Sequence, residues 1–195
     1  MTTPRPRARL LANTISMVQE VGVHAAGLAE LLKRSNTSRN SLYHHFPGGK
    51  GELVETATRI VTRLVSSHLT ATVERLPTAP SAAQWLDDLF AFWREPLDSG
   101  DHRLGSFMMA AALDEENPPV RAASGQAFAA WATVLADGLA AAGFARADAR
   151  ATAGLLLSVI EGAIVQSRAL QSTAPFTDAR DVLTPVLERH LTAAR

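Results

Sequence analysis

The sequence predicts an all-α protein of about nine helices, and three observations lead to that prediction. Apolar residues recur at intervals of three and four along nearly the whole chain, which is the period of an amphipathic helix. No segment shows the sustained alternation of apolar and polar residues that marks a half-buried strand. Glycines, prolines and short polar turns divide the 195 residues into segments of helical length.

The first third of the chain is predicted to contain three short helices and the start of a long one. The short helices cover about residues 7–21, 27–33 and 38–45. Gly22 ends the first helix, and the polar segment 35–37 forms the turn between the second and the third. The segment Pro47-Gly48-Gly49 stops the third helix, and a connecting helix follows over about residues 50–76.

The remainder is predicted to form about five larger helices. They begin near Ala82, Arg103 and Pro118, near Arg146, and after Pro175. Ser81 and Gln84 have the spacing of a capping box, and Thr177 is the expected cap of the last helix. These assignments divide the chain into a small domain over residues 1–50 and a larger one over residues 51–195.

Composition excludes several classes of protein. The chain has no Cys, so it has no disulfide framework, no thiolate metal site and no cysteine nucleophile. Hydrophobic residues make up 47% of the chain, as in a globular protein, and no uninterrupted apolar run reaches the length of a membrane span. The first ten residues lack the apolar core of a signal peptide. We therefore expect a cytoplasmic protein that is not bound to a membrane.

The formal net charge of zero is the sum of two unlike parts. Residues 1–63 hold nine basic and four acidic residues, a net charge of +5, and residues 64–195 carry a net charge of −5. Such an asymmetry favours a basic binding module on a more acidic body. The acidic segment Asp114-Glu115-Glu116 is interpreted as a solvated helix end.

The most informative stretch covers residues 27–46, where two short helices flank a polar turn in the manner of a helix-turn-helix. In the second of these helices Leu42 and Phe46 share one face and are expected to pack inward. Contact-capable side chains then remain on the solvent side: Ser38, Arg39, Asn40 and His44. Arg can read guanine and Asn can read adenine, while Ser and Thr can hold phosphates, so this face suits DNA.

This stretch resembles the DNA-binding domain of the TetR (tetracycline repressor) family of transcriptional regulators. The matching segments are Ala29-Glu30-Leu31-Leu32, then the run from Thr37 to Phe46, then Lys50-x-Glu52-Leu53. The Pro47-Gly48-Gly49-Lys50 variant is similar to the branch around the lincomycin-resistance repressors. The motif occupies about residues 7–65, and the rest of the chain resembles the family in length and helix number.

The resemblance implies an all-helical homodimer in which three N-terminal helices bind DNA and the third enters the major groove. The DNA-binding residues that it implies are Thr37, Ser38, Arg39, Asn40, Tyr43, His44 and Lys50. Tyr43 and His44 would approach the backbone or base edges, and Lys50 would contact a phosphate. One departure concerns the start of the second helix, where His24-Ala25-Ala26-Gly27 offers no hydroxyl as a cap or phosphate ligand.

Other side chains near the motif admit two interpretations. Arg5, Arg7 and Arg9 form either a basic arm that touches DNA or a solvated tail. Adjacent residues on a helix point about 100° apart, so His44 and His45 make a poor chelate and no metal site is expected.

The larger domain is rich in aromatic residues and methionine, which suits a core and also an apolar ligand cavity. The predicted pocket residues are Trp93, Phe107, Met108, Phe128, Trp131 and Glu161. Glu161 lies in an apolar stretch, so it either lines the pocket or pairs with Arg168 or across an interface.

A helix–helix seam is predicted where small residues recur at intervals of four: Gly154, Ser158 and Gly162. Together with apolar residues of the last helix, among them Leu183 and Leu187, this ridge predicts a four-helix dimer interface. The alternative is packing within one subunit.

The leading functional hypothesis is a repressor released from a palindromic operator on double-stranded DNA by a small hydrophobic or aromatic effector. An all-helical enzyme acting on a hydrophobic substrate is an alternative, but the chain has no nucleophile elbow, zinc helix, phosphate loop or dinucleotide fingerprint. A regulator controlled by a protein partner is a further alternative. No cofactor is expected.

Overall fold

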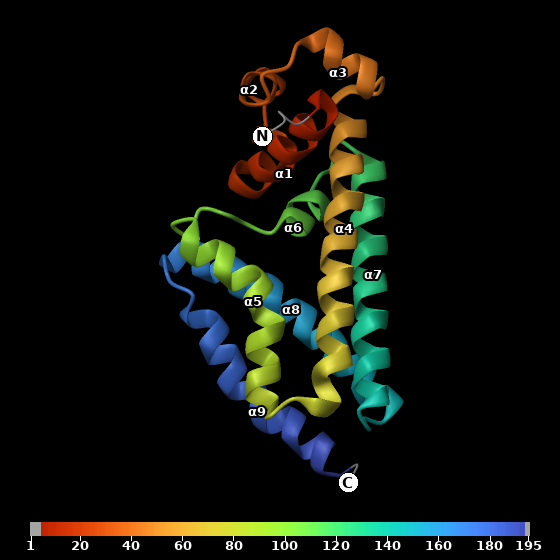
Figure 1. Cartoon of the computed structure of the whole chain (residues 1–195), viewed down its shortest axis with the longest axis vertical. Helices are drawn as coiled ribbons and strands as arrows, with labels where there is room; N and C mark the ends of the chain where they lie inside the picture. Colours follow the sequence, from red (N-terminus) through yellow and green to blue (C-terminus); the bar gives the residue numbers. More distant parts are fainter. Residues whose placement is uncertain (1–4, 194–195) are drawn as a thin grey trace. The chain divides into compact units, whose positions relative to one another are not determined.

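The computed structural model describes residues 5–193, with the side chains of residues 191–193 excepted. Within this range the chain forms nine α-helices and no strand (Figure 1), which confirms the predicted all-α fold. The α-helices are α1 (Pro6–Ala25), α2 (Leu28–Arg34), α3 (Arg39–His45), α4 (Gly49–Arg75), α5 (Ala82–Ser99), α6 (Phe107–Ala112), α7 (Pro118–Ala141), α8 (Arg146–Leu170) and α9 (Ala174–Ala193).

Several helix ends follow the local chemistry that the sequence predicts. The Ser81 hydroxyl accepts a hydrogen bond from the Gln84 N–H at 3.1 Å, which caps α5. Gly22 has φ 81° and ψ 169°, so the regular part of α1 ends there and a further turn continues to Ala25. Gly143 adopts φ 106° after the last residue of α7.

Two predicted boundaries are wrong. Helix α9 begins at Ala174, so Thr177 lies inside the helix, and the Ser172 hydroxyl accepts a hydrogen bond from the Ala174 N–H at 3.2 Å. Helix α6 begins at Phe107 instead of near Arg103 because Ser106 caps it through the Met109 N–H at 3.0 Å. The Gly105 N–H, which a longer helix would use, donates to the Gln19 carbonyl at 2.7 Å.

The chain divides into two compact units whose limits differ from the predicted boundary near residue 50. Unit 1 comprises residues 1–63 and 104–127, and unit 2 comprises residues 64–103 and 128–195. The difference arises because α6 packs against α1, although the two helices are far apart in sequence. Phe107, Ala111 and Val120 share one hydrophobic core with residues of the first 63 positions.

The core of unit 1 joins the three short helices to the first part of α4. It includes buried residues from every one of these helices: Leu10, Val18, Leu31, Leu42, Leu53 and Ala57 among them. Burial of so much apolar area is the main stabilising term for a unit of this size. The two helices of the predicted helix-turn-helix, α2 and α3, are therefore packed on one continuous hydrophobic core.

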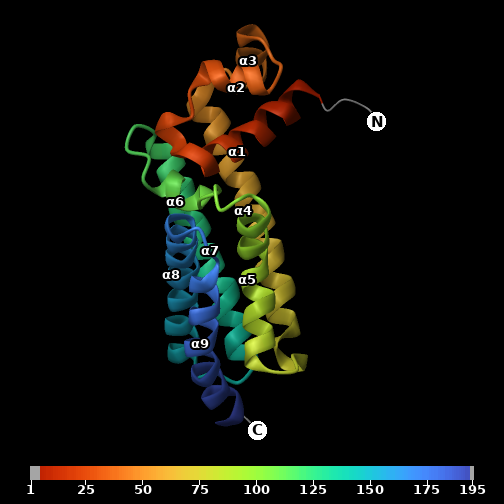
Figure 2. The ribbon, with the colours of Figure 1, turned by 90° about the vertical axis from the view of Figure 1, so that its left-hand side faces the viewer.

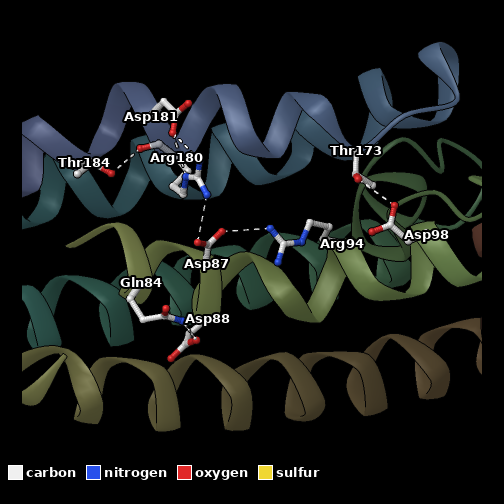
Figure 3. A network of polar contacts seen from close by, with 9 residues as sticks. All are labelled: Gln84, Asp87, Asp88, Arg94, Asp98, Thr173, Arg180, Asp181 and Thr184. Carbon is white, nitrogen blue, oxygen red and sulfur yellow. Dashed lines mark hydrogen bonds and ion pairs between the residues drawn. The ribbon is translucent and has the colours of Figure 1, made fainter. Parts of the chain in front are cut away.

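Unit 2 is built on α5, α8 and α9, which pack against one another (Figure 2). Phe90 and Phe176 meet in its core with ring centroids 5.6 Å apart, and the indole N–H of Trp85 donates to the Thr72 carbonyl at 2.8 Å. Figure 3 shows the polar network between α5 and α9, in which Asp87 accepts from Arg94 at 3.1 Å and from Arg180 at 3.3 Å.

Helix α8 is, by length and composition alone, long and apolar enough to cross a membrane. The core helix of a globular unit meets the same criteria, and the buried residues of α8 pack with α5 and α9. One face of α8 is therefore buried in unit 2, and the other face, which includes Gly154 and Leu155, is exposed.

Candidate DNA-binding site

The turn between α2 and α3 is held by its own backbone. The N–H of Asn36 donates to the Lys33 carbonyl at 3.1 Å, and the N–H of Thr37 donates to the Leu32 carbonyl at 3.0 Å. Asn36 takes φ 45°, in the left-handed region that Asn tolerates better than most residues. The side chain of Thr37 donates to the Ser35 carbonyl at 2.9 Å. This geometry fixes the angle at which α3 leaves α2.

Arg9 fastens this turn to α1. Its Nε donates to the Ser35 carbonyl at 2.8 Å, and its Nη2 donates to the Asn36 carbonyl at 2.9 Å. Carbonyls at the end of a helix lack intrahelical partners, so a cation there satisfies them and matches the helix dipole. Arg9 therefore belongs to the folded core of the motif, and its interpretation as part of a basic arm or a solvated tail is wrong. Sequence reasoning missed this role because the contact spans positions 26 and 27 residues apart.

Arg5 and Arg7 also belong to the start of α1. Arg5 is the N-cap residue of the helix, and its carbonyl accepts from the N–H of Ala8 at 2.9 Å. The guanidinium of Arg7 lies over the Phe46 ring, 5.3 Å from its centroid, in a cation–π arrangement. Both side chains are exposed. Arg7 thus forms a basic edge beside the end of α3, and α1 anchors it there.

Helix α3 has one buried face and one exposed face, as its sequence predicts. Leu42 and Phe46 are 0% and 1% exposed, and they anchor the helix to the core of unit 1. The side chains of Arg39, Asn40, Tyr43 and His44 are exposed. These four residues therefore form a continuous polar surface on a helix that cannot turn about its axis without uncovering Leu42.

The first residues of α3 use their hydroxyls locally. Ser38 is the N-cap, and its hydroxyl accepts from the Ser41 N–H at 3.1 Å. The hydroxyl can still donate a hydrogen bond outward, because accepting one leaves its own hydrogen available. Thr37 is half-buried, and its hydrogen is committed to the Ser35 carbonyl. Of the two predicted hydroxyl ligands, Ser38 is the more accessible in the structure.

The Pro47-Gly48-Gly49 turn positions Tyr43. Gly49 has φ 68°, and a Cβ atom placed there would lie 3.3 Å from the Tyr43 ring. The N–H of Gly48 donates to the Glu52 carboxylate at 2.7 Å, which satisfies the entrance of α4. A Cβ atom placed on Gly48 would lie 3.1 Å from the Glu52 Cβ, so both glycines are explained by close approach. Glu52 is a supporting residue that the sequence motif contained without a stated role.

Lys50 lies at the start of α4 and is partly buried. Its Nζ donates to the His24 carbonyl at 3.3 Å, near the end of α1. Burial lowers the pKa of Lys50 below its ordinary value, and the carboxylates of Asp114 and Glu116 oppose that effect. The structure thus places this predicted phosphate ligand on unit 1, within reach of partners that the sequence did not reveal.

The other charged residues of α2 have different neighbours. Arg34 pairs with Glu20 at 2.8 Å and with Glu30 at 3.0 Å, and these hydrogen bonds raise its pKa. The N-cap of α2 is Gly27, which makes no side-chain cap bond, in keeping with the missing hydroxyl noted in the sequence. Exposed Lys33 is a further cation on this helix.

The predicted pocket residues are divided between the two units. Phe107 and Met108 are each 2% exposed in unit 1, where Phe107 is part of the core shared with α1. In unit 2 Phe128 and Trp131 meet edge to face at 5.4 Å, and the indole N–H of Trp131 donates to the Ser66 hydroxyl at 3.2 Å.

A second aromatic group of unit 2 includes Trp93, and the sequence reasoning missed its central residue. The imidazole of His68 lies 4.9 Å from the Phe92 ring and 5.7 Å from Trp93. Its Nε2 is 2.9 Å from the Leu89 carbonyl, and burial lowers its pKa, so the ring is neutral near pH 7. Glu161 is partly buried in the same unit.

The predicted dimer residues separate into exposed and buried sets. Gly154 and Ser158 are exposed, and a Cβ atom placed on Gly154 or Gly162 would meet no atom within 4 Å. Leu183 and Leu187 are 4% and 0% exposed because they fill the core of unit 2. The prediction that these two leucines face a second chain is therefore wrong, and Val182, at 69% exposure, is a large apolar residue that α9 does expose.

Comparison with known proteins identifies both parts of the chain. A family model described as "Bacterial regulatory proteins, tetR family" matches residues 10–57. A second, described as "Transcriptional regulator LmrA/YxaF-like, C-terminal domain", matches residues 82–182. The first match spans the helix-turn-helix described above, and the second spans most of α5 to α9.

Individual relatives agree with the family models. An uncharacterised HTH-type transcriptional regulator of Mycobacterium tuberculosis is 29% identical over 177 residues, covering 87% of this chain and 88% of the relative. The regulator LmrA of Bacillus subtilis is 24% identical over 184 residues, covering 94% and 97%. A TetR regulator from Legionella pneumophila shares the fold with a TM-score of 0.82 at 17% identity, covering 95% of this chain and 99% of that one. The chain is thus a transcriptional regulator of the TetR family, in its LmrA/YxaF-like group.

Proposed function

We propose that the chain is a repressor that binds a palindromic operator through α3 and leaves it when a small, largely hydrophobic effector binds in unit 2. One observation carries the DNA-binding part. The exposed face of α3 presents Arg39, Asn40, Tyr43 and His44, while the opposite face is locked by Leu42 and Phe46. A rigid helix of this kind can enter the major groove with its N-terminal residues toward the bases.

The side chains of this face suit different parts of the duplex. Arg39 and Asn40, in the first turn of α3, are the candidates for base edges, since Arg pairs with guanine and Asn with adenine. Tyr43, whose ring lies against Gly49, is a candidate for a phosphate, as are Ser38 and His44. Lys50 is the corresponding candidate at the start of α4. The cation Arg7 adds a sequence-independent contact beside them.

Operator binding by point variants tests this assignment. Fragments that the wild-type protein selects from its genome would provide the duplex, and fluorescence anisotropy at fixed salt would provide the affinity. We expect Arg39→Ala to weaken specific binding by roughly ten- to a hundred-fold and to relax base preference at one position. The control Arg63→Ala loses the same charge from an exposed position on α4. If Arg39→Ala and Tyr43→Ala both bind like this control, α3 is not the reading helix.

A homodimer would explain the exposed stripe on α8. Gly154 and Ser158 are exposed and Gly162 is half-buried, and the stripe is flanked by Leu155 and Val165 at 48% and 44% exposure. Exposed apolar area of this kind is typical of an interaction site, and small residues allow a second helix to approach closely. The stripe continues through Ala147 and Ala151, which line a groove of about 760 Å³ between α7 and α8. Two copies joined along α8 would present two α3 helices to a palindrome.

An apolar effector would suit the aromatic side chains of unit 2. Trp93 and Phe92 surround the neutral imidazole of His68, and Phe128 lies with Trp131. Such a site typically combines aromatic walls with few polar groups, and His68, Ser66 and Glu161 are the polar candidates. Because its partner is genomic DNA, we propose that the protein acts in the cytoplasm.

A further inference from the structure

The segment between α6 and α7 is a folded polar loop, and the interpretation of Asp114-Glu115-Glu116 as a solvated helix end is wrong for Asp114 alone, since Glu115 and Glu116 are exposed. Asp114 is 7% exposed, and its carboxylate accepts from the Asn117 amide at 2.9 and 3.1 Å. The same carboxylate accepts from the Glu116 N–H at 3.2 Å. Asp114 therefore organises the loop and fixes the backbone position of Glu116.

This loop, residues 113–117, lies against the junction of α1 and α4 in unit 1. The carboxylate of Glu116 is 3.3 Å from Nδ1 of His24, at the end of α1. A Cβ atom placed on Gly51 would lie 2.9 Å from the Asn117 amide oxygen. Two different residues of the loop thus lie beside the end of α1 and beside the start of α4, where Lys50 is located.

Two kinds of group therefore act on the Lys50 ammonium within unit 1: a backbone carbonyl that accepts its hydrogen bond, and the carboxylates of the loop. Its ammonium donates to the His24 carbonyl at 3.3 Å, beside the residue that pairs with Glu116. The charges of Asp114 and Glu116 act on the same ammonium through space and raise its pKa against the effect of burial. The loop is therefore an anionic neighbour of a cation that we assign to DNA.

We infer that Glu116 competes with the DNA phosphate for Lys50, so that the loop 113–117 sets how strongly the start of α4 holds the DNA backbone. The inference rests on the proposed phosphate contact of Lys50. A carboxylate near the ammonium offsets the attraction of the ammonium for a phosphate, because the two charges act on the phosphate with opposite sign. Glu116 is then a positioning residue that touches no DNA.

If the inference holds, the affinity for DNA can be changed through Lys50 while the position of α3 stays the same. The loop joins α6, which packs on α1, to α7, which continues into unit 2. A displacement of Glu116 by either helix would alter the field at Lys50 while Arg39 and Asn40 kept their places. Such a change affects the sequence-independent part of binding, which dominates affinity more than specificity.

A double-mutant cycle on DNA binding tests the inference. Because the phosphate term does not depend on sequence, a mixed duplex of about 24 base pairs at low salt is a sufficient probe. We expect Glu116→Gln to tighten binding by about two- to five-fold, from the loss of one charge near Lys50. The matched control Glu115→Gln removes the same charge from the neighbouring exposed residue and should give a smaller gain. In a Lys50→Met background the gain from Glu116→Gln should fall to that of the control.

A second measurement needs no DNA. Removal of the Glu116 charge lowers the pKa of Lys50, so more of the amine is neutral at a given pH and acetylation of Lys50, followed by mass spectrometry, should be faster in Glu116→Gln than in Glu115→Gln. Equal rates in the two variants, or an affinity gain that persists without Lys50, would overturn the inference. If Lys50→Met binds DNA like wild type, the proposed phosphate contact fails, and the inference fails with it.

Discussion

At the scale of single residues, the helix-turn-helix depends on side chains that lie outside the two helices of the motif. Arg9 binds the carbonyls at the end of α2, and Gly49 allows the Tyr43 ring to approach the start of α4. Neither residue contacts DNA in the proposed complex. Each acts by fixing the position of a residue that does, so their substitution should change stability and DNA affinity together.

Replacement of Arg9 should loosen the turn. Arg9→Ala leaves the Ser35 and Asn36 carbonyls without their cationic donor, and Ser35 is buried. We expect a loss of about 1.5–3 kcal/mol in the free energy of unfolding, measured by urea denaturation, since hydrogen bonds to charged groups contribute in this range. Arg9→Lys keeps the charge but cannot donate to both carbonyls with the geometry of a guanidinium, so its free energy of unfolding should lie between those of wild type and Arg9→Ala. An Arg9→Ala protein as stable as Arg63→Ala would contradict this role.

Two glycine-to-alanine substitutions should have opposite effects. Gly49→Ala forces a side chain into φ 68° and against Tyr43, at a cost of roughly 1–2 kcal/mol. Gly125 lies within α7 with no atom within 4 Å of a new Cβ, so Gly125→Ala should stabilise the protein by roughly 0.5–1 kcal/mol. Thermal unfolding of the two variants checks the sign. A stabilising Gly49→Ala would show that the turn does not need its left-handed residue.

His68 should make stability depend on pH. Burial lowers its pKa in the folded protein below the ordinary value of 6.5, so the unfolded chain binds the proton more tightly. Its contribution to stability is complete above pH 6.5 and is lost as the pH falls through the lower folded pKa. Between about pH 8 and about pH 5.5, the urea midpoint of wild type should therefore fall more than that of His68→Gln. Parallel pH profiles would show that the imidazole is not desolvated.

At the scale of helices, sequence pattern was reliable where local chemistry decided the outcome and unreliable where a distant contact did. The cap of α5 and the two faces of α3 depend on neighbours three or four residues away, and both predictions are confirmed. The start of α6 depends on Gln19, which captures the Gly105 N–H, and no local pattern contains that contact. The α5–α9 network around Asp87 is likewise invisible in a linear sequence.

The exposed face of α8 leads to a prediction at this scale. Ser158→Arg places a long charged side chain in the centre of the stripe formed with Gly154 and Gly162, and it should convert a dimer to a monomer in analytical ultracentrifugation. The control Thr70→Arg introduces the same group at an exposed position of α4. If Ser158→Arg sediments like the control, the stripe is not the interface between copies. Specific DNA binding should weaken with dissociation, because one helix-turn-helix covers too little DNA.

At the scale of the whole molecule, the net charge of the folded unit that contains the helix-turn-helix is smaller than the net charge of the first 63 residues. Residues 1–63 carry +5, but unit 1 also contains residues 104–127, with three acidic residues and Arg121, so its net charge is +3. The added carboxylates are those of the loop 113–117. Tertiary structure thus brings acidic groups to the basic module, at the point where Lys50 begins α4.

An effector and DNA should oppose each other by equal factors. If an apolar ligand weakens operator binding by some factor, the operator must weaken ligand binding by the same factor, because the coupling free energy is reciprocal. Tryptophan fluorescence can report ligand binding, and we expect the signal to be reduced in Trp93→Phe and retained in Trp85→Phe, whose indole lies in the core. A ligand that quenches both variants equally binds elsewhere.

The sequence by itself determined the helical fold, the helix-turn-helix and the exposed face of α3, because each rests on spacing and caps within a few residues. It also contained the residues of the α8 stripe. Tertiary structure alone decided that Arg9 holds the turn, that Leu183 and Leu187 are core, and that α6 joins unit 1. It also placed Glu116 beside His24, whose carbonyl accepts from Lys50. These outcomes depend on contacts between residues far apart in the chain, whose geometry is fixed by packing and not by local periodicity.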